Sequence, residues 1–218
     1  MPKIYISPSS QYANEGLAPF TTEGAEMSLV ASAVMLLLAV DGRFLAKCST
    51  PEMTDVYEKA RDSNEFGAEV HVAIHSNAGG GEGTEVYAYG AETNSERLAI
   101  ELYTKIAPLS PGVDRGVKYD THLIEVGDCV KATSALIELG FHDNALDAAW
   151  IADCIQEIAT GLYQGICDYF DYDYRDNAVA PIVDHDIYLS VRVRQTKSDD
   201  LIKRIIGMGY ACKALDLA

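Results

Sequence analysis

Paired cysteines are missing from this chain of 218 residues. Its five cysteines are scattered, odd in number and without a CxxC spacing. We therefore interpret them as reduced, mostly buried thiols, and exclude both a disulfide framework and a cysteine zinc site. They are Cys48, Cys129, Cys154, Cys167 and Cys212.

Positive charge is also scarce, because 17 Lys and Arg face 33 Asp and Glu, for a net charge of −16. The basic residues are unevenly placed. From Ile187 onward, six Lys or Arg stand against three Asp, so the rest of the chain is more acidic still. Nucleic-acid binding needs a basic footprint, so we predict no nucleic-acid partner.

Long hydrophobic runs are lacking too. The longest, residues 29–40, is interrupted only by Ser32 and is shorter than the roughly 20 residues that cross a bilayer, so we expect no transmembrane segment. The first residues run directly into a strand-like pattern without the features of a secretory signal. We therefore expect synthesis in the cytoplasm without a signal peptide, and release by other means.

What is present is an alternation of strand-like and helix-like segments. Such alternation predicts an α/β fold, a mostly parallel twisted sheet with helices on both faces. The length allows one well-sized core. We expect strands near residues 3–7, 43–48, 70–75, 84–89, 123–126 and 135–139, and helices near 23–41, 54–66, 93–107 and 146–170.

The composition changes after Phe170. We predict a catalytic domain over 1–170, a linker over 171–186 and a small C-terminal βαβ-like module over 187–218. About thirty residues cannot bury a core alone, so this module should dock on the domain or pair with a second copy. A homodimer through the module is one interpretation.

Two apolar strands carry polar side chains that can act in catalysis or metal binding. One delivers His75 and then Asn77, and the other, some sixty residues later, contains Glu138. Open α/β sheets bind ligands at the carboxyl ends of their strands. A lone carboxylate on an apolar strand is costly to bury, which favours a catalytic role for Glu138.

The segments around these residues resemble motifs of a known enzyme family. GAEVHVAIHSNA (67–78), preceded by RDSN (61–64), and IELGFHDN (137–144) are similar to two motifs of the zinc-dependent N-acetylmuramoyl-L-alanine amidases. Thr21-Thr22-Glu23 resembles the start of that family's ligand-glutamate helix. The resemblance covers roughly residues 3–170.

This resemblance implies a function. Such enzymes cleave the amide between N-acetylmuramic acid and L-alanine in bacterial peptidoglycan, with Zn²⁺ as cofactor. Position by position, it makes His75 and Glu23 metal ligands and Glu138 the general base. Glu26, one helical turn later, is the alternative to Glu23. Because the sequence shows no signal peptide, we expect a phage or prophage endolysin, an autolysin, or an enzyme used from a mother cell, acting on the cell wall after release. The module over 187–218 would then bind the wall or form the homodimer.

One motif departs from the family pattern. The family's first ligand is a histidine in the first loop, where this chain reads SPSSQ over 7–11. Gln11 offers an amide oxygen, a poorer zinc ligand than imidazole. Either Glu23, His75 and Gln11 hold the metal weakly, or another histidine moves in, or the site is empty. The competing functions are a catalytically weak peptidoglycan-binding protein and a zinc peptidase that cuts the stem peptide.

Other polar residues near the two motifs are candidates for substrate binding. Asn77, His142 and Glu125 are assigned to this role. His142 could instead cap the following helix, and Glu125 could be an ordinary surface residue. His71 lies four residues before His75, roughly 13 Å away along a strand, and we interpret it as structural.

Overall fold

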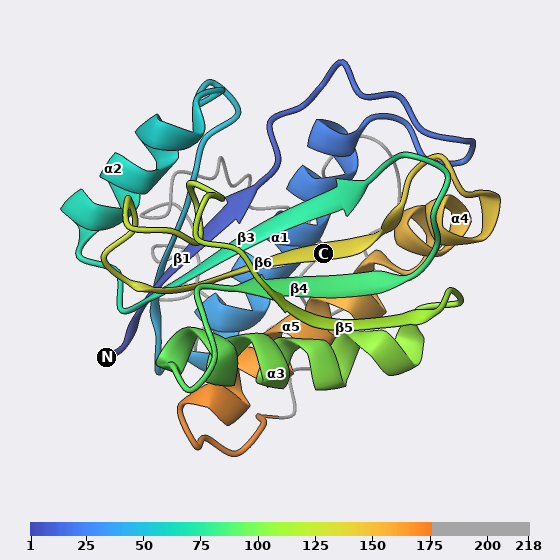
Figure 1. The fold of residues 1–218 in the computed structure, drawn as a ribbon. Coiled ribbons are helices and arrows are strands. Elements are labelled where there is room, and N and C mark those ends of the chain that lie inside the picture. The colour runs from blue at the N-terminus through green and yellow to red at the C-terminus, as the bar shows by residue number, and fades with distance from the viewer. Residues whose placement is uncertain (176–218) are drawn as a thin grey trace, which may run out of the picture.

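A single six-stranded sheet organises the chain, whose computed structural model describes residues 1–175 (Figure 1). The strand order is β2–β1–β3–β6–β4–β5, and β4 runs antiparallel to β6 while the other neighbours are parallel. The predicted mostly parallel α/β sheet is therefore confirmed. The strands are β1 (Lys3–Pro8), β2 (Leu45–Cys48), β3 (Val70–Asn77), β4 (Thr84–Ala88), β5 (Asp114–Tyr119) and β6 (Thr133–Phe141).

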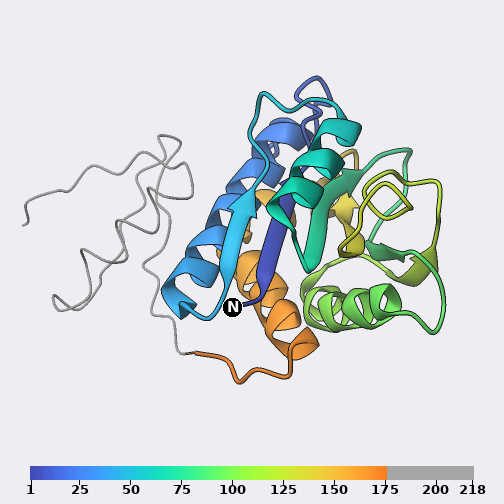
Figure 2. The same cartoon turned by 90° about the vertical axis from the view of Figure 1, so that its left-hand side faces the viewer.

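Helices cover both faces of the sheet, as predicted. Figure 2 shows α1 on one side of the strands and α2 on the other. The buried residues of α1, α3 and α5 belong to one hydrophobic core, whereas α2 contacts the opposite face. The helices are α1 (Glu23–Asp41), α2 (Val56–Phe66), α3 (Asn94–Ile106), α4 (Ala145–Asp153) and α5 (Ile155–Tyr169), with a short 3₁₀ turn at Ala107–Leu109.

The two faces of the sheet differ in chemistry because side chains alternate along each strand. Ile74, Ile137 and Val86 are register partners on neighbouring strands and point into the core shared with α1, α3 and α5. The adjacent residues His75 and Glu138 therefore point to the other face. We call this second surface the polar face.

Helix α1 begins with a cap that also shapes the site. Thr22 is the N-cap, and its hydroxyl accepts a hydrogen bond from the backbone N–H of Ala25. The helix has the predicted length and is long and apolar enough to cross a membrane, although its uninterrupted apolar run is shorter. Of its most apolar window, 72% is buried inside the fold. In this structure α1 serves as a core helix.

Two predicted elements differ from the structure. Residues 123–126 were expected to form a strand, but they form a turn in which the N–H of Val126 donates to the carbonyl of Leu123. The outer strand is β5 instead. The predicted helix 146–170 is two helices, because Cys154 leaves the helical conformation (φ −114°, ψ 31°) between α4 and α5.

The first residues of the predicted linker lie against the domain. Tyr172 packs on Phe44, and the guanidinium of Arg43 stacks over the Tyr172 ring at 4.7 Å. The remaining linker residues and the predicted module 187–218 lie outside the described residues. Among the four cysteines described, none forms a disulfide, but only Cys167 is buried, so the expected burial of most thiols is wrong.

Candidate active site

The polar face carries a row of three ionisable residues, one on each of three adjacent strands. His75 on β3 is in register with Glu138 on β6, and Glu138 is in register with Glu85 on β4. Directly opposed residues in neighbouring strands share a face and lie about 5 Å apart. The two residues that the sequence placed at strand ends, His75 and Glu138, are thus brought together.

Glu23 reaches this row from the first residue of α1. Its Oε1 lies 3.1 Å from Nδ1 of His75, and the carboxylate is 1% exposed. The preceding loop folds over the helix start, because the backbone N–H of Glu23 donates to the carbonyl of Asn14. The amides of Gln11 and Asn14 also donate to the Glu23 carboxylate, at 3.4 and 2.9 Å. Glu26 instead accepts from the backbone and hydroxyl of Thr21, which favours Glu23 as the site residue.

His75 and Glu23 each favour the charged form of the other. Burial works against a charged imidazole, but the carboxylates of Glu125 and Glu23 raise the pKa of His75 to about 10. Burial likewise opposes ionisation of Glu23, yet hydrogen bonds from His75, Ser9 and Asn14 lower its pKa. Glu23 therefore stays a carboxylate, as a metal ligand must.

Glu125 lies behind His75 and is 2% exposed, which contradicts the surface alternative. Its Oε1 accepts from the hydroxyl of Ser7 and lies 3.2 Å from Nε2 of His71. Its Oε2 has no hydrogen-bond partner and lies 3.7 Å from Nε2 of His75, which also has none. Burial raises the pKa of Glu125, but the hydrogen bond with His71 and the nearby imidazole of His75 hold it well below its usual range. His71 is fully buried, with Nδ1 bonded to Ser63, so its structural role is confirmed.

Glu138 differs from Glu23, Glu85 and Glu125 because, among residues 1–175, no side chain forms a hydrogen bond or an ion pair with it. Its Oε2 is buried without a hydrogen-bond partner. Burial raises the pKa of Glu138 to about 7, with His75 opposing the shift and the carboxylates of Glu23 and Glu85 adding to it. A carboxyl group that exchanges its proton near neutral pH suits general acid–base chemistry.

Of the remaining predicted residues, Asn77 contacts a member of this row, whereas His142 contacts Ser76 and Phe20. Asn77 donates to Oε1 of Glu85 at 3.1 Å. His142 is buried, with Nδ1 2.9 Å from the hydroxyl of Ser76 and its ring stacked on Phe20. The helix that follows is capped by Asn144, so the capping alternative for His142 is wrong. The substrate-binding roles of Asn77, His142 and Glu125 stay predictions.

Sequence reasoning missed four residues of the polar face. Asn14 supports Glu23, and Glu85 gathers Arg115 and Lys118 of β5 around its carboxylate. The sequence offered a signal for Glu85, because this carboxylate stands beside the apolar Val86 on a strand, just as Glu138 stands beside Ile137. Arg115 and Lys118 were missed because β5 itself was not predicted.

Glu23 and His75 are the residues that would hold a zinc ion, because a carboxylate and an imidazole are donors that zinc binds. Their atoms Oε1 and Nδ1 lie 3.1 Å apart. Within residues 1–175, no group of three His, Cys, Asp or Glu side chains is arranged to hold a metal. Gln11 turns its amide nitrogen toward Glu23, while its oxygen, the predicted ligand atom, accepts from Asn14 at 2.8 Å. Gln11 as the third ligand stays a prediction and requires its amide to turn over.

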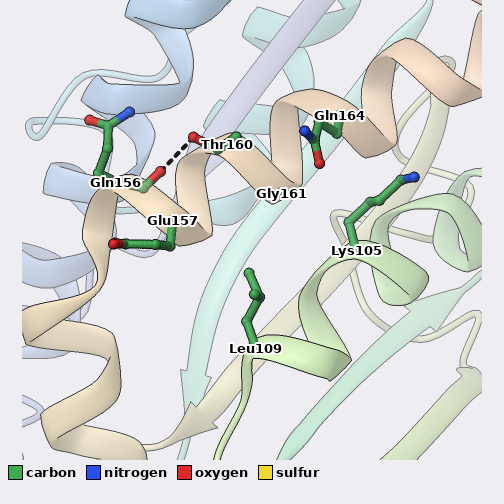
Figure 3. Close-up of a pocket in the computed structure, with 7 residues that line it drawn as sticks. All are labelled: Lys105, Leu109, Gln156, Glu157, Thr160, Gly161 and Gln164. Carbon is green, nitrogen blue, oxygen red and sulfur yellow. Dashed lines mark hydrogen bonds between the residues drawn. The ribbon is translucent and has the colours of Figure 1, made fainter. Parts of the chain in front are cut away.

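A separate hollow of about 300 Å³ lies between α3 and α5 (Figure 3). Its walls include Lys105, which is paired with Asp168, together with Glu157 and polar or small residues. No residue of the row lines it, and α3 and α5 cover the apolar face. The chemistry of the chain is therefore on the opposite side of the sheet from this hollow.

Comparison with known proteins agrees with this geometry. The family model described as N-acetylmuramoyl-L-alanine amidase matches residues 21–168. The N-acetylmuramoyl-L-alanine amidase CwlM of Bacillus licheniformis is 29% identical over 180 residues, covering 78% of this chain and 70% of that protein.

Solved structures share the fold. The catalytic domain of the amidase CwlV from Bacillus (Paenibacillus) polymyxa var. colistinus superposes with a TM-score of 0.70 at 22% identity, covering 79% of this chain and all of that one. The amidase AmiC2 of Nostoc punctiforme gives 0.69 at 19% identity, covering 78% and 97%. The catalytic domain of the CD27L endolysin, which targets Clostridia difficile, gives 0.64 at 21% identity, covering 77% and 98%.

Proposed function

The chain belongs to the N-acetylmuramoyl-L-alanine amidase family, and on that premise we propose that it hydrolyses the lactyl–L-alanine amide of peptidoglycan with the help of zinc held by Glu23 and His75. The observation that carries this proposal is the 3.1 Å approach of Glu23 Oε1 to His75 Nδ1 beside an unpartnered Glu138. Zinc, when bound, supplies a more acidic water and a polarised substrate carbonyl.

Glu138 performs the proton transfers in this proposal. Its carboxylate takes a proton from the water that attacks the lactyl carbonyl carbon. It then gives that proton to the alanine nitrogen as the carbon–nitrogen bond breaks. A pKa of about 7 lets the same group accept and return the proton near neutral pH.

Glu125 positions His75 rather than taking part in bond breaking. When Nε2–H of the neutral ring points at Glu125 Oε2, the ring keeps its lone pair on Nδ1, the nitrogen that faces Glu23. Carboxylates commonly orient metal-binding histidines in this way. Ser7 and His71 in turn fix the carboxylate of Glu125.

The first test combines metal content with cell-wall cleavage. We expect near-stoichiometric zinc in the purified protein, clearing of purified walls by the wild type, and a loss of at least about a hundredfold in rate for Glu138→Gln with zinc retained. Glu82→Gln, an exposed carboxylate on the loop after β3, is the matched control. Absence of metal and of clearing, even with added zinc and several wall types, would favour a peptidoglycan-binding protein.

Product analysis separates the amidase from a peptidase. The amidase releases a peptide with a free N-terminal alanine, whereas a zinc peptidase leaves alanine attached to muramic acid. We also propose that the enzyme acts as an endolysin or autolysin after release from the cytoplasm, which its shared fold with the CD27L catalytic domain supports. Lysis of intact cells by added protein tests that role.

A further inference from the structure

A compact cationic group lies next to the catalytic row. Glu85 is 1% exposed and is in register with Glu138. Its Oε2 forms ion pairs with both Arg115 and Lys118, while its Oε1 accepts from Asn77 and from the hydroxyl of Tyr87. Every one of these partners approaches Glu85 from the polar face or its edge.

The charges in this group do not cancel. Two cations share one carboxylate, and the pKa of Glu85, although raised by burial, is lowered overall by Lys118 and Arg115. The group therefore keeps one positive charge in a chain whose net charge is −16. An unbalanced cation beside the catalytic residue is a feature that a purely structural ion pair does not need.

Arg115 is held so that part of its guanidinium stays available. Nε donates to Glu85, and the guanidinium lies over the ring of Phe141 at 4.9 Å. Its terminal nitrogens have no hydrogen-bond partner among residues 1–175, and 29% of the side chain is exposed. A planar guanidinium fixed in this way presents two N–H groups to an incoming carboxylate.

The distance from Glu138 limits which substrate group can be met. Neighbouring strands are about 4.8 Å apart, so β5, two strands from β6, is roughly 10 Å from Glu138. Two residues of extended peptide span about 7 Å, and the arginine side chain extends inward from β5. A group on the second residue of the stem peptide is therefore within reach when the scissile amide is at Glu138.

We propose that Arg115, assisted by Lys118, binds the free carboxylate on the second residue of the stem peptide. This inference rests on the proposed amidase function and adds a preference among substrates. The second residue of the stem is a glutamate linked through its side chain, which leaves a main-chain carboxylate. In some walls that carboxylate is converted to an amide, which lacks the negative charge.

Matched substrates test this preference. Muramoyl-L-alanyl-D-glutamate and its D-isoglutamine counterpart differ only in the carboxylate. We expect kcat/KM to favour the carboxylate about tenfold, or about 1.4 kcal/mol, mainly through KM, because the amide carries no charge to pair with the guanidinium. Arg115→Gln should remove the preference and Arg115→Lys should restore part of it, whereas Arg97→Gln on α3 should leave it unchanged.

Binding to the Glu138→Gln protein gives a second readout that does not depend on turnover. Calorimetry with the same two muropeptides should show the same preference, and Arg115→Gln in that background should abolish it. Equal binding and equal kcat/KM for both substrates would overturn the carboxylate site while leaving the amidase intact. Cleavage of neither substrate, nor of purified walls, would overturn the proposed function itself.

Discussion

Glu125 connects two imidazoles that lie on the same strand. Its carboxylate contacts Nε2 of His71 through one oxygen and faces Nε2 of His75 through the other. His71 is fully buried, whereas His75 borders the site. The orientation of His75 therefore depends on a residue that reaches it from a loop fifty residues later in the chain.

Replacing Glu125 should weaken metal binding. For Glu125→Gln we expect zinc affinity to fall about 10- to 100-fold, the usual cost of losing the carboxylate behind a metal-binding histidine. Competition with a chromogenic chelator measures this change, and nitrogen NMR of His75 should show the ring losing its preferred tautomer. Glu82→Gln is the control, and unchanged affinity in Glu125→Gln would remove the positioning role.

At the scale of elements, α3 and α5 are packed unusually closely around glycine. A Cβ built on Gly165 of α5 would lie 2.9 Å from the carbonyl oxygen of Glu101 and 2.9 Å from Cα of Leu102. These are backbone atoms of α3, so the helices themselves would have to move apart. This close backbone contact adds to the ion pair between Lys105 of α3 and Asp168 of α5 in holding the two helices together.

Gly165→Ala should therefore destabilise the fold. We expect a loss of about 1–2 kcal/mol, because overpacking outweighs the better helix propensity of alanine. Denaturant unfolding measures it. Gly90→Ala is the control, since a Cβ there meets nothing within 4 Å; equal stability of the two variants would contradict the close-packing argument.

The C-terminal end of α1 is fixed to α5 by a buried carboxylate. Asp41 accepts from Nε of Arg43 at 2.7 Å and from the hydroxyl of Tyr163 at 2.6 Å. Burial raises the pKa of Asp41, but these hydrogen bonds lower it overall. Because its folded pKa is depressed, Asp41 contributes stability above the unfolded pKa of about 3.9, and this is lost as pH falls through the folded value.

Asp41→Asn should consequently cost roughly 1–3 kcal/mol at pH 7. The difference in unfolding free energy between wild type and variant should shrink at pH values below about 4. Denaturant unfolding at pH 7 and pH 3 tests the sign, with the exposed Asp153→Asn as control. A difference that grows as the pH is lowered would contradict the assigned ionisation.

At the scale of the whole molecule, the site residues, His142 included, all come from the first 142 positions of the chain. A chain ending at residue 186 should therefore keep amidase activity on soluble muropeptides. If the module predicted over 187–218 pairs two subunits, this truncation should halve the mass seen by light scattering. An unchanged mass would remove the dimer interpretation, and loss of wall binding alone would assign the module to the wall.

The sequence predicted those parts of the fold that local patterns encode. His75 and Glu138 stand out because each is a polar residue on an apolar strand. Leu123-Ile124-Glu125-Val126 looks equally strand-like, but its position is decided by contacts with β1 and β3 that are distant in sequence. Strand β5 carries few apolar residues because it is an outer strand, so no local pattern marks it or its two cations.

The division of the sheet into an apolar and a polar face has a consequence for how the enzyme can be altered. Successive residues of one strand have different roles: Ile74 and Ile137 belong to the hydrophobic core, whereas His75 and Glu138 belong to the proposed active site. Randomising only the polar-face positions at the carboxyl ends of β3 and β6 would thus search for new specificities while leaving the core shared with α1, α3 and α5 unchanged. The loops that border the polar face could likewise be exchanged while the sheet stays the same.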